Sequence, residues 1–223
     1  MPPVSRWSAR RVALTLVLVA LVLFGLGVAA GSAVEAADDT SLGRADVDGS
    51  RWFEDHRTSA WNAVTDRVTD LAWTPLLVTV AGLTALVAWR VWRRNREALF
   101  VLLTVGGEIG VFVAVAGVVD RPRPPVERLD DVAATASFPS GHTAGAVALY
   151  GALAVLAALH LRRAAVRWLV IGVLALVPVA VALSRLYRGM HYPTDVAGGA
   201  VVGGAWLATV AGTTLASRTE RDR

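Results

Sequence analysis

The chain has 223 residues, 55% of them apolar, and a formal net charge of +4 at pH 7. This apolar content argues against an ordinary soluble domain and favours a protein that lies in a membrane. Cysteine and lysine are both absent. Their absence excludes disulfides, thiolate catalysis and cysteine-ligated metal, and it makes every permanently basic side chain an arginine.

Apolar segments with about the length of a bilayer crossing recur along the whole chain. At 1.5 Å per helical residue, about 20 residues cross a hydrocarbon core of roughly 30 Å. We therefore predict an all-α fold, a polytopic membrane protein whose six transmembrane helices form a single domain over residues 1–223. The predicted spans are 12–31, 72–91, 98–119, 143–160, 167–184 and 196–215.

The first predicted span shares some features with a secretory signal. Arg10 and Arg11 precede its apolar run, and small residues follow it at 29–33. The run of about 19 residues is longer than the apolar core of most signals, so we interpret it as a retained helix. Cleavage as a signal is the alternative, and it would leave the sidedness of the other spans unchanged.

The arginines form short clusters that flank apolar segments. With six crossings, all of these clusters fall on one side of the membrane, and the positive-inside rule makes that side cytoplasmic. The N- and C-termini are then cytoplasmic as well. Short separated clusters also argue against a nucleic-acid interface, which needs a continuous basic face. The clusters are Arg6, Arg10 and Arg11; Arg90, Arg93, Arg94 and Arg96; Arg162, Arg163 and Arg167; and Arg218, Arg221 and Arg223.

The longest segment between two predicted spans is 32–71, on the outer side. Its first half is acidic and contains glycine, which favours a loop. From Trp52 onward, apolar residues recur at spacings of three and four, which predicts an amphipathic helix at the membrane interface. Such a helix either covers the bundle or acts as a lid or a route of access for lipid. The residues that carry the pattern are Trp61, Val64, Val68 and Leu71.

Glu108 lies within the third predicted span. An acidic residue inside a membrane is a functional candidate by default. However, Glu108 is roughly 16 Å from the outer end of its helix, so a hydrogen-bonded structural role is the alternative. His56 and His160 match no motif, and His160 is expected to be structural.

Three short motifs occur in the two outer segments 120–142 and 184–195. These segments can hold ionised groups because non-helical backbone is tolerated where it lines a wet cavity. The first motif is Arg121-Pro122-Arg123-Pro124, the second is Pro139-Ser140-Gly141-His142, and the third is Ser184-Arg185 followed by His191 and Asp195.

The second motif stands where the fourth predicted span begins. The start of a helix presents unpaired amides and the positive end of the helix dipole, which together suit a bound phosphate. Ser140 is alternatively only the cap of this helix. The sequence alone leaves both interpretations open.

The third motif combines a histidine with a carboxylate four residues later. This spacing lets Asp195 hold one nitrogen of His191 and leaves the other as nucleophile or base. A local hydrogen bond in the turn around Pro193 is the alternative. The guanidinium groups of Arg123 and Arg185 match phosphate oxygens, although interfacial arginines also serve as simple membrane anchors.

Taken together, the motifs resemble the signature of the type 2 phosphatidic acid phosphatase superfamily, over about residues 98–215. This resemblance implies that residues 98–215 are the catalytic core and that 1–97 supply the N-terminal spans and the outer amphipathic segment. It implies that His191 attacks phosphorus, that Asp195 orients His191, and that His142 protonates the leaving oxygen. It further implies phosphate binding by Arg123, Arg185, Ser140 and the Gly141 amide, with no metal and no cofactor.

The first motif departs from the family at one position. Counting back from Arg123, the family has a lysine where this chain has Ala116, and no lysine stands elsewhere to replace it. Arg121 or Arg188 is a possible auxiliary cation. The substitution puts the full activity of the site in question, because one lost charged contact can cost orders of magnitude in rate.

We therefore expect a phosphatase in the cell membrane of a bacterium, with its active site on the outer face. The expected substrate is a lipid phosphate or diphosphate, with a polyprenyl diphosphate first and phosphatidate or phosphatidylglycerophosphate next. Membrane lipids are the other expected partners. A non-catalytic lipid-binding or transport protein is the alternative, favoured by Ala116. Haloperoxidase activity is a third interpretation, disfavoured by the apolar composition.

Overall fold

The structure, a computed structural model, describes residues 9–131 and 136–215. Within these two ranges all regular structure is helical and no strand is present, which confirms the predicted all-α fold. The helices of the described ranges are α1 (Ala9–Ala36), α2 (Ser41–Asp55), α3 (Ser59–Asp70), α4 (Thr74–Arg90), α5 (Asn95–Ala116), α6 (Gly141–His160), α7 (Ala164–Tyr187) and α8 (Pro193–Thr214).

Five of these helices are long and apolar enough to cross a membrane, namely α1, α5, α6, α7 and α8. The predicted second span corresponds to α4, which has only 17 residues. α4 follows α3 at a break where the chain bends by 45°, and the two together pass the same test of length and composition. Each of the six predicted spans therefore coincides with a helix, and the second one is part of a bent pair.

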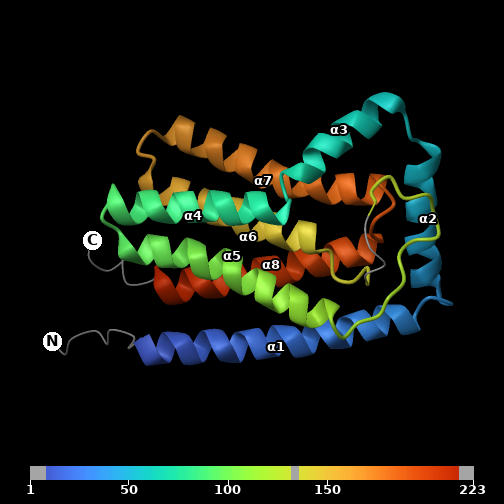
Figure 1. Ribbon diagram of the computed structural model, residues 1–223, viewed down its shortest axis with the longest axis horizontal. Coiled ribbons are helices and arrows are strands. Elements are labelled where there is room, and N and C mark those ends of the chain that lie inside the picture. Colours follow the sequence, from blue (N-terminus) through green and yellow to red (C-terminus); the bar gives the residue numbers. More distant parts are fainter. Residues whose placement is uncertain (1–8, 132–135, 216–223) are drawn as a thin grey trace.

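The long helices lie side by side as a bundle, and the connections between them gather at its two ends (Figure 1). One end holds the start of α1, the α4–α5 and α6–α7 connections, and the end of α8. The opposite end, which we call the site end, holds α2, the segment between α5 and α6, and the turn between α7 and α8. All three sequence motifs lie at the site end, away from the arginine-rich connections.

Glycine allows α6 and α8 to approach each other closely. A Cβ atom at Gly203 would lie 2.5 Å from the backbone oxygen of Ala144, and one at Gly199 would lie 2.4 Å from that of Ser140. Small residues of this kind let two membrane helices meet backbone to backbone. This close approach brings the starts of α6 and α8 together at the site end.

α1 packs against α5 and α8. Its buried residues include Leu16 and Leu23. A Cβ atom at Gly27 would lie 2.8 Å from the side chain of Val115 in α5. α1 is therefore packed closely against α5.

The outer segment contains two helices where the sequence predicted a loop followed by one helix. The predicted loop in its first half is wrong, because α2 begins at Ser41. The side chain of Thr40 caps α2 by accepting a hydrogen bond from the Leu42 amide, and Thr58 caps α3 in the same way. The apolar pattern missed α2 because the buried face of this helix is small and polar. That face consists of Gly43, Asp46 and Ser50.

Candidate active site

The second motif forms the start of α6, and Ser140 is its cap. The Ser140 hydroxyl accepts hydrogen bonds from the amide of Thr143 at 3.5 Å and from its hydroxyl at 3.0 Å. The Ser140 amide donates to the backbone oxygen of Asp195 at 3.0 Å, which ties α6 to α8. Ser140 therefore does cap the helix, and its own hydroxyl proton is still available to an anion placed at the helix start.

Asp195 is fully buried in the first turn of α8. Its Oδ1 accepts a hydrogen bond from Arg121 at 2.5 Å, and its Oδ2 accepts one from the amide of Tyr192 at 2.9 Å. These two donors fix the orientation of the carboxylate. With the carboxylate held by these donors, its Oδ2 lies 3.8 Å from Nδ1 of His191.

The hydrogen-bond partner of His191 Nδ1 is instead the backbone oxygen of Ser137, at 2.7 Å. The expected contact between His191 and Asp195 is therefore a longer electrostatic contact at 3.8 Å and not a short hydrogen bond. A carbonyl oxygen can only accept, so the contact assigns the proton to Nδ1 and leaves the lone pair on Nε2. This tautomer is the one that a nucleophilic imidazole needs.

The surroundings of His191 favour its neutral form. Burial lowers the pKa of its imidazole, and the charge of Arg185 adds to this effect. The neighbouring Asp195 carboxylate counteracts it, but the pKa still lies below its ordinary value. A neutral imidazole with its lone pair on Nε2 is able to attack an electrophilic phosphorus.

Arg185, near the end of α7, is buried with one part of its guanidinium unpaired. Its Nη1 donates to Asp130 at 2.6 Å and to the Thr69 hydroxyl at 2.7 Å. Its Nε is buried and has no hydrogen-bond partner among the described residues. A buried donor without a partner is costly, so this edge of the guanidinium is suited to an incoming anion.

Arg123 and His142 converge on the same region. Arg123 Nη1 donates to the backbone oxygen of Met190, next to His191, at 2.5 Å. Burial lowers the pKa of Arg123, and the charge of Arg185 lowers it further. The ring of His142, in the first turn of α6, is under the influence of the charges of Arg185, His191 and Arg123. Positive charges on these arginines and histidines repel one another, and a phosphate would relieve that repulsion.

The two possible auxiliary arginines already have partners. Arg121 is buried between the carboxylates of Asp46 and Asp195. Arg188 donates to Asp130 at 2.5 Å, to the Leu129 backbone oxygen at 3.0 Å and to α3. Neither arginine therefore has two unoccupied terminal nitrogens to offer a phosphate. Ala116, where the family has its lysine, is the last residue of α5.

Sequence reasoning missed three residues of this region: Asp46, Asp130 and Ser137. Asp130 pairs with both Arg185 and Arg188. Although burial raises the pKa of its carboxyl, the hydrogen bond from Arg188 and the contacts with Arg185 bring it below its ordinary value. Asp130 and Asp46 carry no motif, and Ser137 contributes only its backbone, so no local signal identified them.

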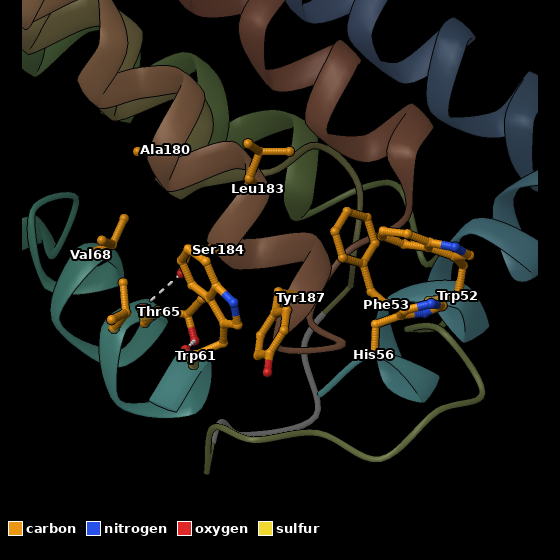
Figure 2. Close-up of a pocket in the computed structure, with 11 residues that line it drawn as sticks. Trp52, Phe53, His56, Trp61, Thr65, Val68, Ala180, Leu183, Ser184 and Tyr187 are labelled. Atoms are coloured by element: carbon orange, nitrogen blue, oxygen red, sulfur yellow. Dashed lines mark hydrogen bonds between the residues drawn. The ribbon is translucent and has the colours of Figure 1, made fainter. Parts of the chain in front are cut away.

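Outside this cluster, α2, α3 and α7 enclose an apolar groove of about 430 Å³ (Figure 2). Its floor includes Ser184, whose hydroxyl donates to the Thr65 backbone oxygen at 2.8 Å. Arg185 follows Ser184 directly, but it points to Asp130 and Thr69 and does not line the groove. The groove is lined by Trp52, Phe53 and His56 of α2, Trp61 and Val64 of α3, and Leu183 and Tyr187 of α7, among others.

The remaining candidate residues lie apart from the cluster. Glu108 is buried in α5, about 12 Å along the helix from its end. Its Oε1 has no hydrogen-bond partner within the described ranges, so the structure does not support a hydrogen-bonded structural role through that oxygen. His160, at the opposite end of α6, lies 2.7 Å from the carboxylate of Glu97. His56 stacks on Trp52 in the groove.

Comparisons with known proteins agree with the arrangement of the motifs. Residues 97–218 match the PAP2 superfamily. The chain is 29% identical over 192 residues to phosphatidylglycerophosphatase B of Bacillus subtilis (strain 168), covering 83% of this chain and 88% of that protein.

Two solved structures share the fold. The crystal structure of a transmembrane PAP2-type phosphatidylglycerolphosphate phosphatase from Bacillus subtilis aligns with a TM-score of 0.72 and 26% identity, covering 94% of this chain and 98% of that one. LpxE from Aquifex aeolicus aligns with a TM-score of 0.59 over 78% of this chain and 96% of that one; at 21% identity it supports the fold alone. With the family match extending over more than half of its length, the chain is a multi-pass membrane protein that belongs to the PAP2 superfamily.

Proposed function

We propose that this protein hydrolyses a lipid phosphate through a phosphohistidine on His191. The observation that carries the proposal is a pair of cations, the half-buried Arg123 and the buried Arg185, beside a neutral His191 whose Nε2 is unprotonated. A dianionic phosphate on these cations would meet the lone pair of Nε2. The Nε of Arg185 supplies a donor that has no partner among the described residues.

In the first step, Nε2 of His191 attacks phosphorus while the bond from phosphorus to the lipid oxygen breaks. The leaving oxygen takes a proton from His142, which acts as general acid. In the second step His142 accepts a proton from water, and the resulting hydroxide attacks the phosphohistidine. This releases inorganic phosphate and returns His191 to its starting state.

Four groups are proposed to hold the non-bridging oxygens, namely Arg123, Arg185, Ser140 and the amide of Gly141. The two arginines neutralise charge, and the helix start supplies amide and hydroxyl donors. Position 141 has no room for a larger residue, because a Cβ atom there would lie 2.6 Å from the ring of Phe112 in α5. Asp195 acts indirectly, by keeping a negative charge 3.8 Å from Nδ1 of His191.

The proposed substrate is a phosphate monoester of a glycerophospholipid. The sequence alone put a polyprenyl diphosphate first, but the similarity to phosphatidylglycerophosphatase B moves phosphatidylglycerophosphate ahead of it. Phosphatidate and the polyprenyl diphosphate remain in second place. The arginine-rich connections lie at the end opposite the site, which supports a site on the outer face of the membrane.

The groove between α2, α3 and α7 supports the interpretation of the outer segment as a route of access for lipid. It is apolar and lies at the site end, where the tryptophans of α2 and α3 are exposed. Tryptophan favours the membrane interface. The alternative, that α2 and α3 only cover the outer end of α7, predicts that substitutions in the groove leave turnover of lipid substrates unchanged.

The test is the release of phosphate by the purified protein in detergent with a chelator present. Phosphatidylglycerophosphate, phosphatidate and a polyprenyl diphosphate are compared as substrates. His191→Ala is expected to abolish turnover, whereas the control His160→Gln, at the other end of the bundle, is expected to keep it. A wild-type protein that is inert on all three lipids would favour the alternative of a non-catalytic lipid-binding or transport protein, which Ala116 supports.

A further inference from the structure

Arg121 joins the outer helix α2 to the start of α8. Its Nη2 lies 2.8 Å from Oδ2 of Asp46, and its Nη1 lies 2.5 Å from Oδ1 of Asp195. Its guanidinium also lies over the ring of Tyr192, 4.1 Å from the centroid. The side chain is fully buried. A buried cation between two buried carboxylates fixes both of them, because each would be costly to leave unpaired.

Asp46 also binds the start of α8 directly. Its Oδ1 accepts a hydrogen bond from the amide of Thr194 at 3.1 Å, and its Oδ2 accepts one from the Thr194 hydroxyl. Asp46 thus supplies, from a helix that lies 148 residues earlier in the chain, a negative charge at the amino end of α8. This end of a helix attracts anions.

The backbone of Arg121 reaches His191 by a second route. Its carbonyl oxygen accepts a hydrogen bond from the amide of Ser137 at 2.9 Å. The carbonyl oxygen of Ser137 in turn lies 2.7 Å from Nδ1 of His191. Both groups next to Nδ1, the Ser137 carbonyl and the Asp195 carboxylate, are therefore held by Arg121.

We propose that Asp46 is a positioning residue for His191 and acts through Arg121 and Asp195. Asp46 shares the charge of Arg121 and fixes its side chain from the side opposite Asp195. Without Asp46, Arg121 would keep Asp195 and, on Nη2, only the exposed Asp38 at 3.6 Å. Arg121 and Asp195 would then be freer to shift. The Asp195 carboxylate would then lose its fixed distance from the His191 ring. This inference rests on the proposed role of His191 as the nucleophile.

The test compares Asp46→Asn with Asp48→Asn in phosphate release from the best lipid substrate of the wild type. Asp48 makes a matched control because it is exposed on the same helix and undergoes the same change. Asp46→Asn is expected to lower kcat by about 10- to 100-fold with little change in KM, since small misplacements of catalytic groups have effects of this size. Asp46→Glu, which restores the charge, is expected to recover part of the loss.

A double-mutant cycle tests whether Asp46 affects kcat through Asp195. In an Asp195→Asn background, Asp46→Asn is expected to cause little further loss of kcat, because groups that act through one another are not additive. Full additivity, a change in KM alone, or an equal effect of Asp48→Asn would overturn the proposal.

Thermal unfolding in detergent shows whether Asp46→Asn is folded. If it is not, Thr194→Val decides the question, because it removes one partner of Arg121 and one of Asp46. A several-fold lower kcat in Thr194→Val supports the positioning role, and an unchanged kcat overturns it. If His191→Ala retains turnover, the proposed mechanism fails, whereas a wild-type kcat in Asp46→Asn together with an inactive His191→Ala defeats only the positioning role.

Discussion

Two arginines at the site end of the bundle, Arg121 and Arg185, are both buried and both paired with aspartate, yet they differ in what they can still bind. Both terminal nitrogens of Arg121 are occupied by carboxylates, Asp46 on one and Asp195 on the other. Arg185 has carboxylate and hydroxyl partners on Nη1 only among the described residues. The Nε atoms of both arginines are buried and have no partner there, so the difference lies in the terminal nitrogens.

This difference separates an arginine that holds the fold from one that is suited to bind substrate. The two cannot be told apart by residue type, by burial or by their place in a motif. The number and position of the carboxylates that other segments bring to each guanidinium make the distinction. A buried arginine paired with two carboxylates has little charge to offer a phosphate, whereas one that shares a single carboxylate with another arginine gains from binding it.

Arg185 and Arg121 are expected to respond differently to substitution. Arg185→Met is expected to lower kcat/KM by about 10²–10³-fold, because it removes a charged donor to the transferred phosphate. Its effect on stability is expected to be small, since Asp130 keeps its bond to Arg188. Arg121→Met leaves two buried carboxylates unpaired, so it is expected to reduce the free energy of unfolding by about 3–5 kcal/mol.

Thermal unfolding in detergent and phosphate release, measured on the same preparations, give both quantities. We expect Arg121→Met to lose activity together with stability. Arg185→Met is expected to lose activity alone. Equal losses of stability in the two variants would show that Arg185 is a structural residue as well.

Asp130→Asn removes the carboxylate partner of Arg185 and leaves the arginine in place. Inorganic phosphate is then expected to inhibit several-fold more strongly, because it no longer competes with Asp130 for the guanidinium. The pKa of Asp130 lies below its ordinary value in the folded protein. The wild-type carboxylate is therefore ionised between about pH 5 and 8, and the effect of the substitution is expected across that range.

The measurement is the inhibition constant of inorganic phosphate at several pH values. The wild type should approach the variant only as the pH falls through the lowered pKa of Asp130, where its carboxyl becomes neutral. Weaker inhibition in Asp130→Asn would instead show that Asp130 orients Arg185 toward phosphate.

Ala116→Lys is expected to have the smallest effect. It restores the cation that the family signature has at the end of α5, and a gain in kcat/KM of up to about tenfold is expected from one added charged contact. Burial lowers the pKa of Arg123 and the charge of Arg185 lowers it further. A further cation beside these two would add repulsion, so part of this gain is offset. Ala116→Met serves as the uncharged control, and equal rates in both variants would show that the site does not need a further cation.

The sequence predicted the helical segments of the bundle well and the outer segment poorly. Apolar segments reveal membrane helices because a bilayer accepts little else, which is why all six spans coincide with helices. α2 was not predicted because its buried face carries Gly43, Asp46 and Ser50. These residues have no apolar side chains, so the sequence of α2 shows no apolar periodicity. The second predicted span was correct in place, but the bend between α3 and α4 was not foreseen.

Within the candidate site, the sequence identified residue types and missed partners. Ser140 was correctly recognised as the start of a helix. The expected pairing of His191 with Asp195 occurs at 3.8 Å, longer than a hydrogen bond. The spacing of four residues cannot reveal that Arg121 and the Tyr192 amide also bind the carboxylate. The actual partner of His191, a backbone oxygen of Ser137, has no side-chain signature at all.

The sequence by itself determined that this is an all-α membrane protein and that its motifs gather at one end, because hydropathy, helix length and the distribution of arginine follow from the chemistry of single segments. Which arginine carries a carboxylate on each terminal nitrogen, and which carries one on a single nitrogen, followed from the tertiary structure alone. That outcome depends on carboxylates delivered from remote segments, Asp46 by α2 and Asp130 by the α5–α6 connection. Electrostatic pairing inside a buried cluster is a property of distances between elements, and local sequence patterns do not encode those distances.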